Sequence, residues 1–378
     1  MIGEAEWRKA QGELAAETGA GFLTPVEYFH PWYARAVGRY IVGEHLRRPA
    51  AAPLRIVEMG GGNGTCAAGL LGLLREHFPE IYATCRYELV EISPTMAERQ
   101  ARRLRESGID QERFAVHNCS AIEWARSAPV RPGPSYMLGL ELLDNLPHDL
   151  VRWTDRGLEQ AVVERGVDGS CTQLWEPLAD EALVRTVQML QLDTRNAWQA
   201  AALVRARSHP GLSVLRPLRI CSAWLDVVTA RQPCMYVPTS AALLLEGLVR
   251  AEPQHSLVLA DFDWLPPQPG GALGAPVVQS KAGEETVDRA GRVLDAIDGE
   301  CDVFHPSDFG MLERLYRAVG GARARTVKTR DFMREYAELE GTETRSGYNP
   351  LVEDFSNTSL LLARASDAGA GDERQGSG

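Results

Sequence analysis

The sequence lacks the features that would place it in a membrane or on a nucleic acid. No apolar run reaches the roughly 20 residues that a membrane-spanning helix needs. The formal net charge is −11, so no overall positive field attracts phosphate backbones or anionic lipids. The N-terminal residues include acids that a signal or transit peptide would avoid. We therefore expect a globular protein with no membrane span, no recognisable targeting peptide and no nucleic acid as its main partner.

Several catalytic and metal-binding motifs are also missing. The chain has no G-x-S-x-G elbow, no H-E-x-x-H, no Walker loop and no metal-ligand spacing among its 8 histidines. Its 7 cysteines are scattered, odd in number and never in C-x-x-C spacing, which argues against a zinc site or a disulfide framework. We expect no metal, and a reducing compartment fits best.

What the sequence does contain is an alternation of short apolar runs and helical patterns, which is typical of a parallel sheet with crossover helices. Helices are expected to begin near Thr65, Pro94 and Ser120. The fold class predicted is α/β, a doubly wound, mostly parallel, seven-stranded sheet of the Rossmann-like kind. Its expected strands are 54–59, 86–91, 114–117, 136–141, 256–261, 325–328 and 358–363.

The same pattern divides the chain into five parts. Residues 1–50 form an N-terminal helical segment, 51–149 the cofactor-binding half of the sheet, and 256–364 the rest of it. Between them, 150–255 is interpreted as a mainly helical insertion or substrate subdomain with one strand pair, near 158–163 and 170–175. The tail 365–378 has almost nothing to bury and is predicted to be disordered.

A glycine-rich turn follows the first expected strand in LRIVEMGGGNGT. Glycine permits positive φ and close approach of a ligand, and the helix that follows offers unpaired N–H groups to an anionic group. A dinucleotide-binding turn would read G-x-G-x-x-G, whereas Gly60, Gly62 and Gly64 give G-x-G-x-G. With Glu58 just ahead, this spacing is the form associated with S-adenosylmethionine. The alternative is an ordinary tight turn between strand and helix.

A second cofactor element is predicted at the ends of the next two strands. Glu91 ends YELVE, where its carboxylate would accept hydrogen bonds from both ribose hydroxyls. Asn118, Cys119 and Ser120 follow the third strand, at the usual place for contacts with the adenine edge. Ligands of such sheets bind beyond the carboxyl ends of the strands, where all these residues lie.

The candidate reaction centre follows the fourth strand in GLELLDNLPHD. Methyl transfer requires an in-line nucleophile, and carboxylates can position an amine or guanidine and help to remove its proton. Glu141 and Asp144 suit that role. For His148 and Asp149 we prefer solvation of a loop, and capping is the alternative for Asp144.

Further candidates lie near the same edge. Asp261 ends the fifth strand, and Asp263 and Trp264 after it could line the opening. His30 and Tyr33 belong to the early segment TPVEYFHPWY, which either has a structural role or closes over the cofactor.

Taken together, these motifs resemble the MidA-like methyltransferase family, which includes a mitochondrial arginine methyltransferase that assists assembly of respiratory complex I. The motifs are TPVEYFHPWY, VEMGGGNGT, YELVEISP, ELLDNLPHD, LVLADFD, GAPVVQSK and FHPSDFGMLERLY, and the resemblance covers roughly residues 21 to 364. Their order along the chain is more specific than any one of them.

The resemblance implies a class I methyltransferase fold, S-adenosylmethionine as cofactor, and methylation of an arginine in a complex I subunit. By position, Glu58, the three glycines and Glu91 would bind the cofactor, and Glu141 and Asp144 would face the substrate. A mitochondrial location follows from the resemblance, with the cytoplasm as the alternative. The oligomeric state is left open between a monomer and a homodimer.

Two positions depart from the better-known members of the family. Asn63 stands in the glycine turn where they have arginine, and Leu140 stands before the strand-end acid where they have histidine. These departures make the arginine substrate less secure than the cofactor. The alternatives are a small-molecule methyltransferase with the insertion as a lid, and a non-catalytic assembly or scaffold protein that retains the fold.

Overall fold

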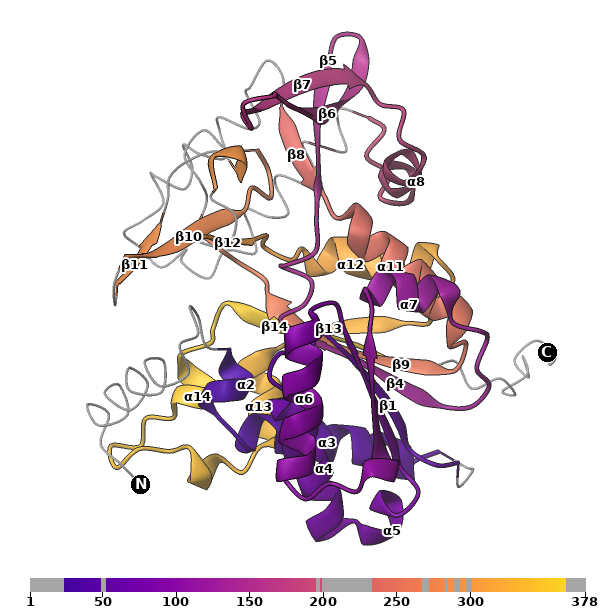
Figure 1. Cartoon of the computed structure of the whole chain (residues 1–378), viewed down its shortest axis with the longest axis vertical. Helices are drawn as coiled ribbons and strands as arrows, with labels where there is room; N and C mark the ends of the chain where they lie inside the picture. The colour runs from indigo at the N-terminus through magenta and orange to yellow at the C-terminus, as the bar shows by residue number, and fades with distance from the viewer. Residues whose placement is uncertain are drawn as a thin grey trace, which may run out of the picture.

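A seven-stranded sheet forms the centre of the protein (Figure 1). The computed structural model describes residues 24–48, 52–194, 198, 233–266, 272–282, 285–288, 293–296 and 301–364. The strand order is β13-β14-β9-β4-β1-β2-β3, and only β14 runs antiparallel to its neighbours within this sheet. The strands are β1 (Arg55–Met59), β2 (Arg86–Glu91), β3 (Phe114–Asn118), β4 (Ser135–Leu140), β9 (His255–Phe262), β13 (Ala324–Lys328) and β14 (Thr358–Ala363).

This sheet confirms the predicted fold class. Every one of the seven expected strands is present, and the ends agree to within one residue. The strands β4 and β14 are buried along their whole length, because helices cover both faces of the sheet. The alternation of apolar strands and amphipathic helices in the sequence therefore corresponds directly to the doubly wound fold.

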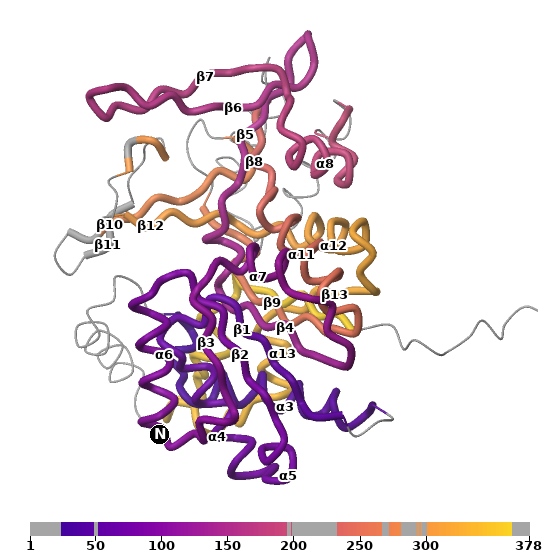
Figure 2. The backbone as a smooth tube through the Cα atoms, turned by 45° about the vertical axis from the view of Figure 1, so that its right-hand side comes forward, coloured from indigo at the N-terminus to yellow at the C-terminus, as the bar shows by residue number. Residues whose placement is uncertain are grey.

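Helices pack on both faces of the sheet (Figures 1 and 2). One layer consists of α3 (Trp32–Leu46), α4 (Thr65–His77), α6 (Pro94–Glu106) and α13 (Thr329–Tyr336). The other layer consists of α7 (Ala121–Ser127), α11 (Thr239–Ala251) and α12 (Phe309–Ala318). The described residues also form three short helices and three 3-10 turns. These are α2 (Pro25–Tyr28), α5 (Pro79–Tyr82), α14 (Pro350–Glu353), η1 (Gln111–Arg113), η2 (Val293–Asp295) and η3 (Leu339–Gly341).

Two of the long helices, α6 and α12, begin at side chains that cap them. Ser93 accepts a hydrogen bond from the N–H of Met96 at the start of α6 (3.4 Å), and Pro94 occupies the first helical position. Asp308 accepts one from Met311 at the start of α12 (2.9 Å). The expected helix 26–46 is divided into α2 and α3, and the first expected helix lies outside the described residues, as does the tail 365–378.

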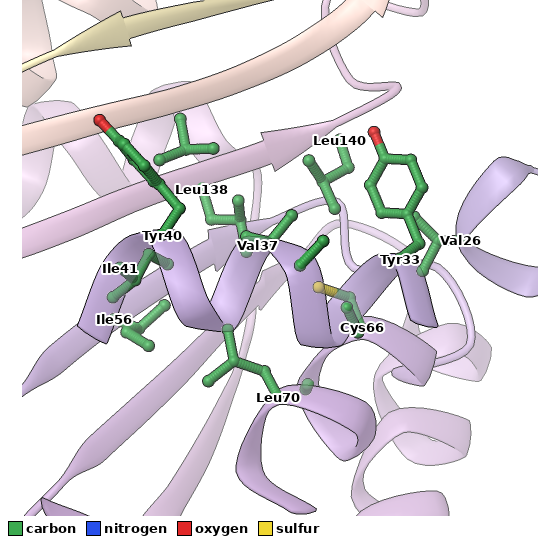
Figure 3. Packing of buried hydrophobic residues seen from close by; sticks show 14 of the residues in the cluster. Val26, Tyr33, Val37, Tyr40, Ile41, Ile56, Cys66, Leu70, Leu138 and Leu140 are labelled. Atoms are coloured by element: carbon green, nitrogen blue, oxygen red, sulfur yellow. The ribbon is translucent and has the colours of Figure 1, made fainter. Parts of the chain in front are cut away.

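The first helical layer packs tightly because small residues face each other. Figure 3 shows Tyr33, Val37 and Tyr40 of α3 beside residues of the sheet and α4, all within one buried cluster. A Cβ added to Gly69 of α4 would stand 2.7 Å from Cβ of Ala34, closer than real Cβ atoms approach. This close contact fixes the N-terminal segment against the helix that follows the glycine turn.

A second, four-stranded antiparallel sheet, β7-β6-β5-β8, projects beyond the main sheet at the top of Figure 1. It contains β5 (Asp149–Thr154), β6 (Gly157–Arg165), β7 (Cys171–Pro177) and β8 (Cys234–Val237), and α8 (Glu181–Met189) follows β7. The expected strand pair is confirmed as β6 and β7, whereas β5 and β8 were not foreseen. Most of the stretch expected to be helical, 195–232, lies outside the described residues. Although α11 falls in the expected insertion, it packs against α7 beside the main sheet.

A third, three-stranded sheet has the order β11-β10-β12. Its strands are β10 (Val277–Ala282), β11 (Glu285–Asp288) and β12 (Cys301–Phe304). Among the described residues, no helix combines the length and apolar character of a membrane span.

Candidate active site

The glycine turn adopts the backbone conformation that its sequence predicts. Gly60, Gly62 and Gly64 have φ angles of 68°, 50° and 78°, which side chains rarely allow. The turn leads from β1 into α4, and the N–H of Gly60 donates to the carbonyl of Val90 on β2 (2.9 Å). A Cβ added to Gly62 would meet no atom within 4 Å, so open space lies beside the turn at this point. A ligand can approach the backbone there.

Glu58 lies beneath this turn. It is 2% exposed, and the Tyr87 hydroxyl donates to its Oε2 (2.8 Å). A Cβ on Gly61 would stand 3.1 Å from the same carboxyl group. Burial raises the pKa of Glu58 to about 7, which the hydrogen bond from Tyr87 only partly offsets. The carboxyl group can therefore gain or lose a proton near neutral pH, and an ammonium group beside it would favour the charged form.

Glu91 is buried at the end of β2, and protein donors hold both of its carboxylate oxygens. Oε1 accepts a hydrogen bond from the backbone N–H of Ser93 (2.9 Å). Oε2 accepts one from Nε2 of Gln100 on α6 (3.1 Å). Each oxygen retains a further lone pair, so a diol could bind across the carboxylate. This arrangement is compatible with the predicted ribose contact.

Asn118 ends β3 and lies beside Glu91, and Cys119 and Ser120 follow it. The amide of Asn118 donates to the backbone carbonyls of Glu91 (2.8 Å) and Ile92 (3.1 Å), and so joins the end of β3 to the end of β2. Cys119 is partly buried, and burial raises the pKa of its thiol. Ser120 is the N-cap residue of α7. The contact of these three residues with adenine stays a prediction. The two hydrogen bonds of Asn118 show that it also stabilises the ends of the two strands.

The early segment packs over the glycine turn, a relation that the sequence analysis left open. Glu27 of α2 accepts hydrogen bonds from the Thr65 hydroxyl (2.6 Å) and the Asn63 amide (3.3 Å). Arg103 of α6 forms an ion pair with Glu27 (3.7 Å) and a hydrogen bond to Thr65. Glu27 and Arg103 were not among the predicted site residues, because no local motif links them to a turn so far away in the sequence.

The predicted acids gather at the adjacent strand ends. Glu141 directly follows β4 and has a φ of 54°, unusual for a residue with a side chain. Asp261 of β9 accepts hydrogen bonds on Oδ2 from the backbone N–H groups of Leu143 (2.8 Å) and Asp144 (3.0 Å), and on Oδ1 from Phe262 (2.7 Å). The turn that contains both candidate catalytic acids is therefore tied to β9 by one carboxylate.

Burial raises the pKa of all three acids. Burial, and then the charges of Asp144 and Asp261, hold the pKa of Glu141 well above its usual range. Burial raises the pKa of Asp144 to about 6, and burial together with Asp144 raises that of Asp261. Tyr33 lies close enough for Glu141 and Asp261 to add to the increase that burial causes in its own pKa. Among the ion pairs that the described residues form, none involves Glu141, Asp144 or Asp261.

Leu143 of the same turn lines a small pocket, together with His148, Tyr236 and Met311. The pocket has room for only about one water molecule. The imidazoles of His148 and His305 stack there, with ring centroids 4.1 Å apart, and Tyr236 packs against His305 at 5.0 Å. From the sequence we preferred solvation of a loop for His148. In the structure its side chain is instead part of an aromatic cluster.

The other candidates have different surroundings. Asp149 is exposed at the start of β5. Asp263 forms an ion pair with Lys328 and accepts a hydrogen bond from Ser359. The carbonyl of Trp264 accepts a hydrogen bond from Asn357 (3.1 Å). Within the described part of the chain, no group of acidic, histidine and cysteine side chains is arranged to hold a metal ion.

The residues at the sheet edge fit S-adenosylmethionine. The open space at Gly62 admits the cofactor to the turn, and the N-terminus of α4 lies directly beyond. The buried Glu91 carboxylate suits a ribose diol, and the nearby Glu58 suits an ammonium group.

Comparison with known proteins agrees with this geometry. Residues 36–327, more than half of the chain, match the family described as "Putative S-adenosyl-L-methionine-dependent methyltransferase". A search of curated protein sequences found no match.

Two solved structures from Burkholderia thailandensis share the fold. One is titled a "likely methyl transferase" bound to S-adenosyl-homocysteine. It is 16% identical with a TM-score of 0.57, over 93% of this chain and 81% of that one. The other, a native structure of an uncharacterized protein, is 14% identical with a TM-score of 0.55, over 95% and 91% of the two chains.

The fold, the glycine turn and the family match lead to the same conclusion. The resemblance to MidA-like methyltransferases is confirmed at the level of the family, and with it the enzyme class and the cofactor. The chain belongs to this family of methyltransferases that use S-adenosylmethionine.

Proposed function

We propose that the protein is a protein arginine N-methyltransferase whose acceptor is an arginine in a subunit of respiratory complex I, during assembly of the complex in the mitochondrion. The observation that supports an arginine is the cluster of Glu141, Asp144 and Asp261. Burial raises the pKa of each of these carboxyl groups, and neighbouring acids add to the increase at Glu141 and Asp261. None of the three forms an ion pair within the described part of the chain. An incoming cation would stabilise their charged forms, and a guanidinium pairs with carboxylates through parallel hydrogen bonds. The complex I subunit and the mitochondrial location rest on the MidA-like resemblance.

In such a reaction, the acidic residues at this turn have different roles. When bound, S-adenosylmethionine supplies a methyl carbon that accepts a nitrogen lone pair as its bond to sulfur breaks and leaves the electron pair on sulfur. Glu141 and Asp144 bind the guanidinium, orient one nitrogen and accept the proton that it releases. The pKa of about 6 at Asp144 is suitable for taking up a proton near neutral pH. Asp261 holds the turn in place.

A small-molecule acceptor is the second candidate, and the aromatic cluster of His148, His305 and Tyr236 favours it, because aromatic rings stack on flat acceptors. The pocket that Leu143 and His148 line has room for only about one water molecule, so such an acceptor would have to lie against the cluster and not inside this pocket. The two candidates predict different acceptors for the same cofactor site.

The test is transfer of a tritiated methyl group to four acceptors: an arginine-rich peptide, the same peptide with lysine in place of arginine, purified complex I subunits, and a set of small amines. We expect methylarginine from the first and from a complex I subunit, none from the lysine peptide, and a loss of at least about a hundredfold in Glu141→Gln. Glu164→Gln, at an exposed acid of β6, is the matched control and should retain activity.

Equal labelling of both peptides, or labelling of small amines alone, would contradict the arginine proposal and favour the small-molecule candidate. Cofactor binding without transfer to any of these acceptors would favour a non-catalytic assembly protein. Methylation of the arginine peptide but of no complex I subunit would retain the chemistry and reject the proposed partner.

A further inference from the structure

Gln100 links two parts of the cofactor site, the glycine turn and the carboxylate of Glu91. It lies on α6 and is wholly buried. Its Nε2 donates to the carbonyl of Gly62 (2.9 Å) and to Oε2 of Glu91 (3.1 Å). A Cβ on Gly64 would stand 3.1 Å from Cα of Gln100, so this helix approaches the turn about as closely as a glycine allows. One amide group thus links the glycine turn to the carboxylate at the end of β2.

The orientation of this amide is determined by its neighbours. Both neighbouring groups are acceptors, so only the NH₂ end of the amide can face them. Oε1 of Gln100 is consequently buried without a hydrogen-bond partner among the described residues. An unpaired buried oxygen is unfavourable, and a leucine or methionine at this position would avoid it. The amide is therefore there for its two donated hydrogen bonds and not for packing alone.

We propose that Gln100 is a positioning residue for the cofactor, which holds the Glu91 carboxylate and the Gly62 carbonyl in the geometry that receives the ribose. Ser93 holds Oε1 of Glu91 and Gln100 holds Oε2, so the carboxylate cannot rotate. Each oxygen retains a lone pair that one ribose hydroxyl can use. This inference rests on the predicted ribose contact of Glu91, and it adds α6 to the elements that determine cofactor affinity.

The test is isothermal titration of the full chain with S-adenosylhomocysteine. Gln100→Glu retains the shape of the side chain but places a carboxylate against Glu91. We expect its Kd to increase about tenfold or more, because a hydrogen bond to a charged group is replaced by repulsion. Gln100→Met, which lacks the donor without adding charge, should also weaken binding and serves if the first variant does not fold. Glu98→Gln, at an exposed position of the same helix, is the control and should change Kd less than about twofold.

Two further measurements separate positioning from general stability. Glu91→Gln and the double variant with Gln100→Met complete a mutant cycle, and we expect the two effects not to add, since Gln100 acts through Glu91. The wild type should bind a 2′-deoxy analogue more weakly than S-adenosylhomocysteine. In Gln100→Met, the Kd values of the two ligands should differ little.

Each alternative result has a distinct meaning. Unchanged affinity in both Gln100 variants, with weakened binding in Glu91→Gln, would overturn the role of Gln100 and leave that of Glu91. Additive effects would also overturn it, because Gln100 would then act elsewhere. Unchanged affinity in Glu91→Gln would overturn the ribose contact itself and this inference with it, whereas the arginine proposal depends on neither residue.

Discussion

Replacement of Glu58 by glutamine should make the protein more stable at alkaline pH and change little at acid pH. Glu58 is 2% exposed beneath the cofactor turn, and burial raises its pKa from 4.5 to about 7. A carboxyl group with a raised pKa in the folded state binds a proton more tightly there than in the unfolded chain. Its contribution to stability is complete below pH 4.5 and is lost as the pH rises through about 7.

The size of the effect follows from that shift. One pKa unit corresponds to about 1.4 kcal/mol, so the free energy of unfolding should fall by about 2 to 3 kcal/mol between pH 5 and pH 8 through Glu58 alone. Glutamine cannot ionise, and its carbonyl oxygen can still accept the hydrogen bond from Tyr87. Glu58→Gln should therefore lack this part of the pH dependence.

The assay is urea unfolding of the wild type and Glu58→Gln at pH 5 and pH 8, without cofactor. Other groups titrate as well, but they are common to both proteins, so the difference between the two free energies isolates Glu58. We expect the difference to favour the variant by about 2 kcal/mol more at pH 8 than at pH 5. A difference that is the same at both pH values would refute the assignment of a raised pKa to this buried carboxyl group.

Two other substitutions test neighbouring parts of the sheet. Although burial opposes it, hydrogen bonds from His117 and Arg131 lower the pKa of Glu88 to about 2, so its contribution to stability is present above pH 4.5 and lost as the pH falls toward 2. Glu88→Gln should destabilise the protein at pH 7 by about 1 kcal/mol more than at pH 3 in the same unfolding assay, because at pH 3 the contribution is reduced but not yet lost. Equal destabilisation at both pH values would contradict the ion pair. Asp261→Asn should place an NH₂ group against backbone donors, including the N–H of Asp144, and cost about 2 kcal/mol of stability with a fall in kcat. A kcat equal to that of the wild type would show that Asp261 does not position the turn.

The main sheet was predictable because its strands are short apolar runs bounded by turns, and their buried faces impose that pattern on the sequence. The strands β5 and β8 were missed for the opposite reason. Asp149 to Thr154 mixes charged and apolar residues, and four of the six residues of this strand are at least partly exposed, so little hydrophobic pattern marks it.

The site could be predicted only where its residues lie close together in the sequence or end consecutive strands. Gly60, Glu91 and Glu141 satisfy that condition, since parallel strands bring their carboxyl ends to one edge. Glu27 reaches Thr65 across 38 positions, and the amide of Gln100 reaches Gly62 across the same number. Such contacts depend on how α2 and α6 pack, which no local motif encodes.

The central claim is that the glycine turn binds S-adenosylmethionine, and the most direct test is isothermal titration with S-adenosylhomocysteine and, separately, with NAD. Gly62→Ala adds a methyl group in the open space beside the turn. Gly169→Ala is the matched control, because Gly169 also has a positive φ, of 83°, and an added Cβ there also meets no atom within 4 Å, but it lies between β6 and β7. We predict that S-adenosylhomocysteine binds to the wild type and to Gly169→Ala, that Gly62→Ala binds it at least about tenfold more weakly, and that NAD does not bind. Wild-type affinity in Gly62→Ala, or binding of NAD in place of S-adenosylhomocysteine, would contradict the account.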